Sequence, residues 1–149
     1  MISRFERFSF AISGIYRSIQ KVERDEMERY GLKGGYAQYL VAMARHPQGL
    51  TSAQLCEICD LDKAAVSRSI GEMEEHGLLE RLAVNNAYRA KLRLTEKGLA
   101  AADYVSRRAQ QAVSVAGSGL SEEDREVMYR ALESIAAHLQ VISKEGIPE

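Results

Sequence analysis

Long apolar stretches are absent from this 149-residue sequence. Arg, Glu or Lys interrupts every segment that could otherwise cross the hydrocarbon core of a bilayer, which needs about 20 apolar residues in a helix. The pattern of a secretory signal peptide is missing as well. We therefore expect a cytoplasmic protein that has no membrane partner.

Cysteine and histidine are scarce, with two and three residues respectively. The only cysteine pair is Cys56 and Cys59, and His46, His76 and His138 show no ligand spacing with it. A structural zinc site would need a second cysteine pair or suitably spaced histidines. The sequence therefore predicts no metal site and no cofactor.

The Cys-x-x-Cys spacing of Cys56 and Cys59 has two interpretations. Such a pair is found in redox and metal chemistry, but free cysteine commonly behaves as a small buried hydrophobe. In a helix, Cys59 falls on the same stripe as Leu55 and Ile58, and Cys56 lies toward its margin. Packing explains both thiols, and a cysteine-based redox-sensing regulator is the alternative.

Motifs of enzyme chemistry are missing. The glycines form neither a GxGxxG nor a Walker loop. Ser67 has no histidine or lysine placed to activate it, and no paired carboxylates form a recognisable constellation. The acidic run at 72–75 is explained more simply as a solvated helix face. The sequence therefore predicts that the protein is not an enzyme and has no catalytic residues.

An excess of positive charge is also lacking. The chain has 20 Lys and Arg against 21 Asp and Glu, a net charge of −1 and a pI near 6.3. Taken alone, this balance lowers the expectation of nucleic-acid binding. Any binding to nucleic acid therefore has to depend on where the positive charges lie. The length of the chain suits one domain or one subunit of a small oligomer.

What is present, at residues 50–77, is the pattern of two capped helices separated by a sharp turn. Thr51 and Gln54 are spaced as a capping box at the start of the first helix. Three residues of turn follow that helix, and Asp62 then caps the second one. Gly77 ends the second helix in the left-handed cap position. This is the spacing of a helix-turn-helix.

The second helix carries the features that suggest what the motif binds. Its inward stripe is predicted to be Val66, Ile70 and Met73, and its outward face near the start Ala64, Ser67, Arg68 and Gly71. Small residues let the backbone come close to a partner, and Ser67 and Arg68 can hydrogen-bond to base edges. The start of this helix therefore suits a DNA major groove. Its later glutamates would be repelled by phosphate, so its C-terminal half is expected to leave the groove.

After Gly77 the apolar residues alternate, which is typical of strands. One arm of a hairpin is predicted from Leu82 and Val84, the tip from Asn85 and Asn86, and the other arm from Ala90, Leu92 and Leu94. No acidic residue occurs from 81 to 94. The cations of this segment are Arg81, Arg89, Lys91 and Arg93.

This cationic hairpin predicts a wing that supplies contacts to DNA phosphates. Arg89, just past the tip, is best placed to reach the DNA backbone or the minor groove. Arg81 and Arg93 lie nearer the base, where Glu72, Glu75 or Glu80 are available as ion-pair partners. A merely solvated strand face is the alternative.

Long helices are predicted on both sides of this lobe. The first, at 3–29, has apolar residues at alternating steps of three and four: Phe5, Phe8, Ile12, Ile15, Ile19 and Val22. A short helix at 36–45 then places on one side Tyr36, Leu40 and Met43. The apolar seam of the first helix has two equally good explanations. The helix could pack on the core of its own domain, or it could pack against another helix.

Two further helices are expected after the hairpin. Thr95 caps a helix whose inward residues are predicted to be Leu99, Ala102, Ala109, Val113 and Ala116. Ser121, followed by three acidic residues, begins a last helix with the stripe Met128, Ala131, Ile135, Leu139 and Ile142. Both ends of the chain thus offer apolar seams.

Three runs of residues together resemble the MarR family of winged helix-turn-helix repressors. They are Asp62-Lys63-Ala64-Ala65-Val66-Ser67-Arg68, Met73-Glu74-Glu75-His76-Gly77-Leu78-Leu79-Glu80-Arg81 and Leu94-Thr95-Glu96-Lys97-Gly98. The similarity covers nearly the whole chain in order. The family's wing commonly has an Asp-x-Arg pair at its tip. Here Ala87-Tyr88-Arg89 occupies that place, so the arginine matches and its aspartate partner is absent.

The resemblance implies a mainly α fold with a small β-hairpin (α+β) in a single MarR-like domain, residues 1–149. It implies a DNA-binding lobe at 34–94, and dimerisation and connecting helices at 3–29 and 95–143. The implied protein is a homodimeric repressor that binds a pseudo-palindromic double-stranded DNA operator and is released by a small aromatic effector. Some relatives sense oxidants through an N-terminal cysteine, which this chain lacks. A winged-helix protein-interaction module without DNA binding is the alternative.

The expected site residues fall into two sets. The DNA-binding set is Thr51, Ser52, Gln54, Asp62, Lys63, Ala64, Ser67, Arg68, Asn85, Asn86, Arg89 and Lys91. The effector set, chosen by residue type and by the region that the resemblance implies, is Tyr16, Arg17, Tyr36, Tyr39 and His46. Each member of the effector set is also of a type found in cores or on surfaces.

Overall fold

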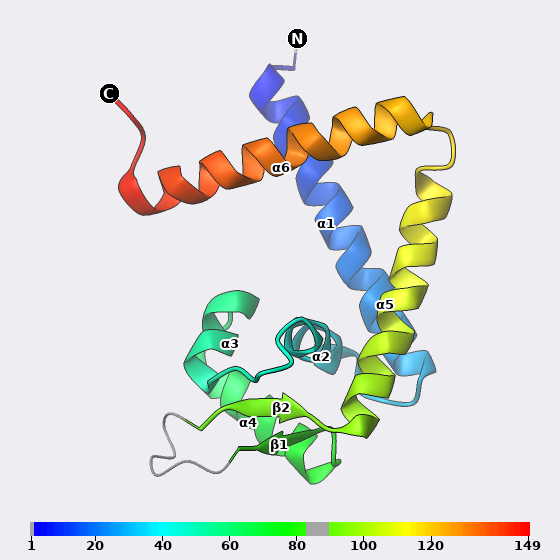
Figure 1. Ribbon diagram of the computed structural model, residues 1–149, viewed down its shortest axis with the longest axis vertical. Helices are drawn as coiled ribbons and strands as arrows, with labels where there is room; N and C mark the ends of the chain where they lie inside the picture. The colour runs from blue at the N-terminus through cyan, green and yellow to red at the C-terminus, as the bar shows by residue number, and fades with distance from the viewer. Residues whose placement is uncertain (1, 83–89) are drawn as a thin grey trace. The chain divides into compact units, whose positions relative to one another are not determined.

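A computed structural model of the chain describes residues 2–82 and 90–149 (Figure 1). The elements follow in the order α1 (Arg4–Arg29), the 3-10 helix η1 (Gly34–Tyr36), α2 (Ala37–Ala44), α3 (Ser52–Cys59), α4 (Lys63–Glu75), β1 (Leu79–Arg81), β2 (Leu92–Leu94), α5 (Glu96–Ala116) and α6 (Glu122–Glu145). The fold is mainly helical with one small hairpin, as the sequence predicts. Residues 1–113 form one compact unit and residues 114–149 a second.

Helix α2 is the centre of the core of the first unit. Its buried residues are Ala37, Tyr39, Leu40, Val41, Ala42 and Met43, so the prediction that only one side packs was too narrow. A helix that is apolar all round is a buried helix. In Figure 1, α2 is seen end-on, and it contacts α1, α3 and β2.

Local hydrogen bonds fix the helix-turn-helix as predicted. Thr51 Oγ1 accepts from the Gln54 N–H at 3.2 Å, and Gln54 Oε1 accepts from the Thr51 N–H at 2.9 Å, which is a complete capping box. Asp60 closes α3 in the left-handed region with φ 52°. Asp62 Oδ1 then accepts from the Ala65 N–H at 2.8 Å and starts α4.

The hairpin packs against this motif through backbone pairing. β1 and β2 are antiparallel with Leu79 opposite Leu94. Leu50, the residue before the α3 cap, exchanges both backbone hydrogen bonds with Leu92, at 3.0 and 2.7 Å. The chain segment entering α3 therefore joins the edge of β2. The predicted tip residues Asn85 and Asn86 lie outside the described residues, as do Val84 of the first arm and Arg89 just past the tip.

Two predicted helix faces are rotated from their expected positions. On α3, Ile58 was predicted to face inward but is 48% exposed. Cys56 packs with Cys59 on the core instead. On α5, the exposed residues include Leu99, Val113 and Ala116, whereas the buried ones are Gly98, Ala101, Ala102, Val105 and Ala109. A helix stripe of small residues packs closely on the lobe, and the larger apolar residues of α5 lie beside that contact or beyond it.

A buried carboxylate joins the end of α1 to α5. Glu26 is only 7% exposed, and it accepts hydrogen bonds from Tyr104 Oη and Arg108 Nε, both at 3.2 Å. The hydrogen bond from Arg108, with the nearby charges, holds the pKa of Glu26 below its usual range. The rings of Tyr30 and Tyr104 pack beside it with centroids 5.1 Å apart. These contacts fix where α5 leaves the lobe.

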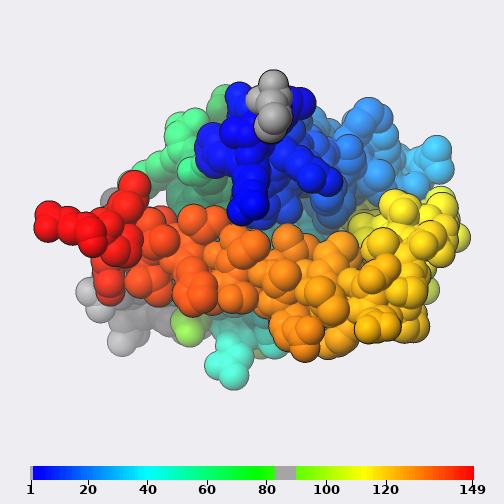
Figure 2. Space-filling view, turned by 90° about the horizontal axis from the view of Figure 1, so that it is seen from above, coloured from blue at the N-terminus to red at the C-terminus, as the bar shows by residue number. Residues whose placement is uncertain are grey.

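Much of α1 and all of α6 expose apolar side chains. Ser3 and Glu6 form a capping box at the start of α1, and only Glu26 and Met27 of that helix are buried. α6 begins at Ser121, whose Oγ accepts from the Asp124 N–H, and none of its residues is buried. Figure 2 shows α6, in orange, along its length.

Candidate nucleic-acid interface

The start of α4 presents an open polar and small-residue face. Val66, Ile70 and Met73 are buried as predicted. Ala64, Ser67 and Arg68 are exposed on the other side, and Gly71 is half-buried with space around its Cα. Lys63 is also exposed and takes part in an interaction within the chain. The predicted base-reading residues therefore share one accessible face.

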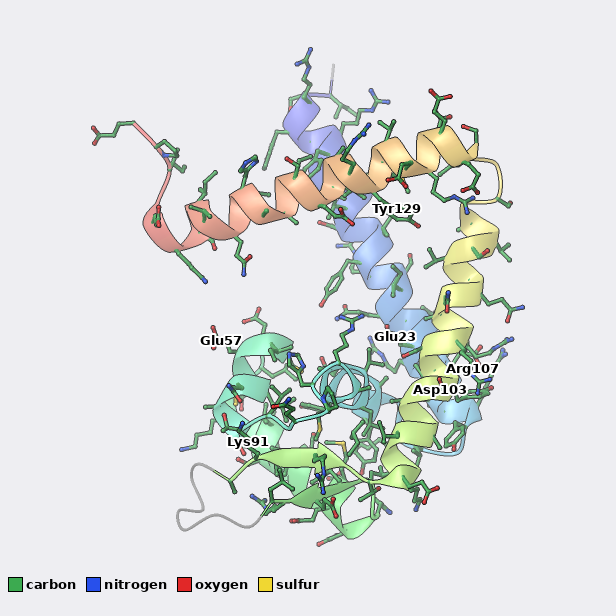
Figure 3. The ribbon with its side chains drawn as sticks, viewed as in Figure 1. Glu23, Glu57, Lys91, Asp103, Arg107 and Tyr129 are labelled. Carbon is green, nitrogen blue, oxygen red and sulfur yellow. The ribbon has the colours of Figure 1, made fainter. Side chains whose placement is uncertain are left out.

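Arg68 differs from the other arginines near this face. Within residues 2–82 and 90–149, neither an ion pair nor a hydrogen bond is found for its side chain. Lys91, beside β2 in Figure 3, is likewise exposed without such a partner in the described part of the chain. Both cations are available to an external anion.

The other two hairpin cations among the described residues are already neutralised. Arg93 donates to Glu80 Oε1 from Nε at 3.2 Å and from Nη2 at 2.8 Å, as the sequence suggested. Arg81 donates through Nε to Glu74 at 3.1 Å, a partner that was not among those expected. These pairs are roughly half exposed, so each contributes little stability. The Arg81–Glu74 pair joins the hairpin base to α4, and the Arg93–Glu80 pair joins the two strands. Both pairs reduce the positive charge that the segment offers to phosphate.

Three of the residues predicted to contact DNA cap helices within the chain. Thr51 and Gln54 hold the α3 capping box, and Asp62 holds the α4 cap. Ser52 is half-buried in the first turn of α3. Capping does not exclude a role toward DNA, because the helix N-terminus that the side chain caps can also bind an anion. The roles of these residues toward DNA stay predictions.

A tyrosine beneath α4 was missed as a positioning residue. Tyr36 is 4% exposed, and its hydroxyl donates to Glu72 Oε2 at 2.9 Å. Lys33 Nζ donates to the same oxygen at 3.3 Å. Burial, together with Glu72, raises the pKa of Tyr36 to about 12, so the hydroxyl keeps its proton and remains a donor at neutral pH. No sequence spacing indicates this pairing, because its partners are 36 residues apart.

Removing the Tyr36 hydroxyl tests this link. Tyr36→Phe is expected to lower the free energy of unfolding by about 1 kcal/mol, because a buried hydrogen bond is lost with little change of shape. Thermal unfolding at fixed protein concentration measures it. The matched control is Tyr129→Phe, since Tyr129 is exposed on α6 (Figure 3). Equal melting temperatures for the two variants would show that the Tyr36 to Glu72 hydrogen bond does not stabilise the fold.

The predicted effector residues do not converge in the described structure. Tyr16 and Arg17 are exposed on α1, whereas Tyr36 and Tyr39 belong to the core. His46 is exposed at the end of α2, and it is the one member of the set that lines the cavity at the hairpin base described below. The described residues of a single chain do not bring the five effector residues together in one site. Their role toward an effector stays a prediction.

The two thiols sit half-buried against the core. Both Cys56 and Cys59 are free, and Cys59 Sγ is 4.0 Å from the Gln38 carbonyl oxygen. Burial, with a smaller contribution from Cys56, raises the pKa of the Cys59 thiol. A higher pKa lowers the thiolate fraction and with it the reactivity toward oxidants.

We therefore expect no oxidant response from these thiols. Peroxide treatment should leave DNA binding by the wild-type protein and by the Cys56→Ala/Cys59→Ala variant equally unchanged. Fluorescence anisotropy of labelled DNA measures both. Loss of binding in the wild type that the double variant abolishes would contradict this prediction.

Within the described ranges, no group of three or more His, Cys, Asp or Glu side chains is arranged to hold a metal ion. A search of the same residues finds no helix that combines the length and the apolar character needed to cross a membrane.

Known structures share this fold over 93–100% of the chain. A putative MarR family transcriptional regulator from Listeria monocytogenes, solved in complex with a 26mer DNA, has a TM-score of 0.74 at 24% identity and covers 100% of this chain and 99% of its own. An uncharacterised SlyA-like transcription regulator from the same organism has a TM-score of 0.74 at 25% identity, over 93% and 95%. A MarR regulator from Methanosarcina mazei reaches 0.78 at 23%, over 95% and 94%. No curated protein matches the chain.

A capped helix pair with an exposed second helix, followed by an antiparallel hairpin, defines a winged helix-turn-helix protein. The sequence model of the MarR family matches residues 30–87, which contain the capped helix pair and β1 and end before β2. Residues 30–87 thus match the MarR family, and the chain shares its fold with solved MarR family transcriptional regulators. Members of this family are regulators and not enzymes.

Proposed function

We propose that this protein is a homodimeric transcriptional repressor that binds a pseudo-palindromic DNA operator and is released by a small molecule. The observation that carries the proposal is the accessible face at the start of α4, where Ala64, Ser67 and Arg68 are exposed together. A helix N-terminus with small residues and one unpaired arginine is suited to enter a major groove and hydrogen-bond to base edges. Ser67 and Arg68 are the proposed base contacts.

The remaining DNA-binding residues are proposed to position the protein. Thr51, Ser52 and Gln54 lie at the N-terminus of α3, where backbone N–H groups and the helix dipole favour a phosphate. Lys91 supplies a free cation from the hairpin. The proposal extends to Asn85, Asn86 and Arg89, which lie outside the described residues. Operator binding would take place in the compartment that holds the DNA, so we propose a cytoplasmic protein.

Gel shift with the DNA that flanks the protein's own coding region tests the proposal. A discrete shift that survives a large excess of random DNA is expected. Two-fold symmetry requires half-sites about one helical turn, or a multiple of it, apart. Deleting the gene should raise transcription of the adjacent operon if the protein is a repressor. The absence of any shift would favour a protein-interaction module, and lower transcription after deletion would indicate an activator.

The dimer is proposed from unpartnered apolar surface. Phe5 is 76% exposed and Ile15 57% exposed on α1, and α6 is a 24-residue helix without a buried residue. An isolated helix is only marginally stable in water, and its apolar face needs a packing partner. A second copy of the chain supplies such a partner with matching seams, and it also provides the second half-site reader.

Sedimentation at micromolar concentration should therefore give twice the 16.6 kDa mass of one chain. Ile15→Asp is expected to shift the protein toward monomer, because a carboxylate in an apolar interface must be desolvated. Ser13→Asp is the matched control on the exposed opposite side of α1. A wild-type monomer that still binds the operator would rule out the dimer.

A further inference from the structure

A cavity of about 350 Å³ lies between the end of α2, the base of the hairpin and the first turns of α5. Its volume falls in the range of sites that bind small organic molecules, about 300–1,000 Å³. Met43, Leu94 and Leu99 form much of its apolar wall. Leu99 is 49% exposed, and its apolar side chain lines this cavity instead of joining the core.

One ring nitrogen of the histidine in the cavity is a hydrogen-bond donor within the chain. His46 Nδ1 lies 2.9 Å from the Ala42 carbonyl oxygen. A carbonyl only accepts hydrogen bonds, so Nδ1 carries the hydrogen. In the neutral ring, Nε2 is then left as an acceptor. His46 therefore offers the cavity a hydrogen-bond acceptor.

The charged side chains of the cavity are also mainly acceptors. Arg93 directs Nε and Nη2 to one oxygen of Glu80, so the second Glu80 oxygen is left for another donor. Glu96 is exposed, and none of its side-chain oxygens has a hydrogen bond in the described part of the chain. Two carboxylates and one guanidinium line the cavity, which gives its rim a net negative charge.

The geometry points to a binding site for a small organic cation with an apolar body, of the arylalkyl amine class. Its ammonium group would donate to Glu96, to the free oxygen of Glu80 and to His46 Nε2, while its ring would cover Leu99. An ammonium has three donors, and this rim offers that many acceptors. A carboxylate ligand of the same shape would meet the net negative charge and bind more weakly.

Occupancy of this site bears on the proposed function. Glu80 lies on β1 and Arg93 on β2, the two strands that lead into the hairpin. An ammonium on the second Glu80 oxygen shares the carboxylate charge with Arg93 and so weakens the ion pair at the hairpin base. The affinity for the operator would then change with occupancy. This step depends on the proposed operator binding, whereas the site itself does not.

Isothermal titration calorimetry of the full chain without DNA tests the site, with phenethylamine and phenylacetate as probes of matched shape and opposite charge. Phenethylamine is expected to bind with a Kd below about 1 mM and at least about tenfold more tightly than phenylacetate. Glu96→Gln should weaken phenethylamine about tenfold, and Leu99→Asn should weaken it as well. The matched control is Glu57→Gln, because Glu57 is an exposed carboxylate on α3 (Figure 3).

The site would be overturned if no heat of binding is seen at 5 mM phenethylamine, which is on the order of five times the expected Kd limit. Equal affinity for the two probes would also overturn it. So would equal affinity of the Glu96→Gln and Glu57→Gln variants for phenethylamine. Fluorescence anisotropy with labelled operator, in the presence and absence of phenethylamine, tests the coupling. An unchanged operator Kd at saturating amine would overturn the coupling and leave the site. Absence of operator binding would overturn the proposed function without affecting the calorimetric result.

Discussion

Replacing Gly98 with alanine is expected to lower the free energy of unfolding by about 3 kcal/mol, the upper part of the range for overpacking a close contact. For a chain of this length, the melting temperature should fall by about 6–12 °C. Gly98 is fully packed in the first turn of α5. A Cβ at this position would collide with the Leu78 carbonyl oxygen and also approach Leu94 Cδ2 to 3.2 Å.

The obstacle is backbone that cannot move cheaply. The Leu78 carbonyl accepts from the Thr95 N–H at 3.1 Å, and Thr95 Oγ1 in turn accepts from the Gly98 N–H at 3.2 Å as the cap of α5. Shifting either chain to admit a methyl group breaks this set of hydrogen bonds. The close approach therefore fixes the junction between α4, the hairpin and α5.

Gly71→Ala is the matched control, since Gly71 lies inside α4 with no atom within 4 Å of the Cβ position. Alanine there should stabilise the helix by about 0.5–1 kcal/mol. Thermal unfolding at one protein concentration compares the two variants. A Gly98→Ala melting temperature equal to that of the wild type would show that the α5 contact relaxes freely.

The sequence predicted the parts of this fold that depend on local hydrogen bonds. The capping box at Thr51, the Asp62 and Ser121 caps and the left-handed Gly77 all use side chains or dihedral angles within a few residues. Because such interactions depend on residue type and spacing, they can be read directly from the sequence. The Ser121 side chain caps α6 as a simple N-cap, as expected from the acids that follow it.

Helix faces were harder to predict, because the deciding contact lies far along the chain. Leu99 was expected in the core, but the close approach of Gly98 to the Leu78 carbonyl rotates α5 so that alanines pack instead. Ile58 was expected inward, but Cys56 and Cys59 take that place against α2. Apolar periodicity locates a stripe without stating how close the facing element comes.

Site chemistry was predictable mainly where one helix or one hairpin supplies it, as for Arg93 and Glu80. The face of α4 that holds Ser67 and Arg68 follows from helical geometry alone. The Tyr36 to Glu72 hydrogen bond and the Arg81 to Glu74 pair join separate elements, and many alternative partners were available to each side chain. The effector set stays a prediction, since residue type and region do not fix which side chains meet.

Arg68 is expected to be the most sensitive position for operator recognition. The hairpin cations Arg81 and Arg93 are paired with glutamates, whereas Arg68 is exposed and has no ion pair within the described ranges. No internal contact has to be broken before its guanidinium meets DNA. A bidentate contact to guanine is worth about 1–3 kcal/mol of discrimination, or roughly 5- to 150-fold in affinity.

Arg68→Ala should therefore weaken operator binding by roughly 5- to 150-fold, with a much smaller loss on random DNA, because base contacts specify the site and phosphate contacts do not. Anisotropy titrations on both DNAs at one salt concentration measure the ratio. Arg107→Ala is the matched control, since Arg107 is an exposed arginine on α5 paired with Asp103 at 3.0 Å (Figure 3). It removes the same charge away from α4 and should leave the ratio unchanged. Equal losses on operator and random DNA for Arg68→Ala, together with a salt slope lowered by about one unit, would mean that Arg68 contacts only phosphate.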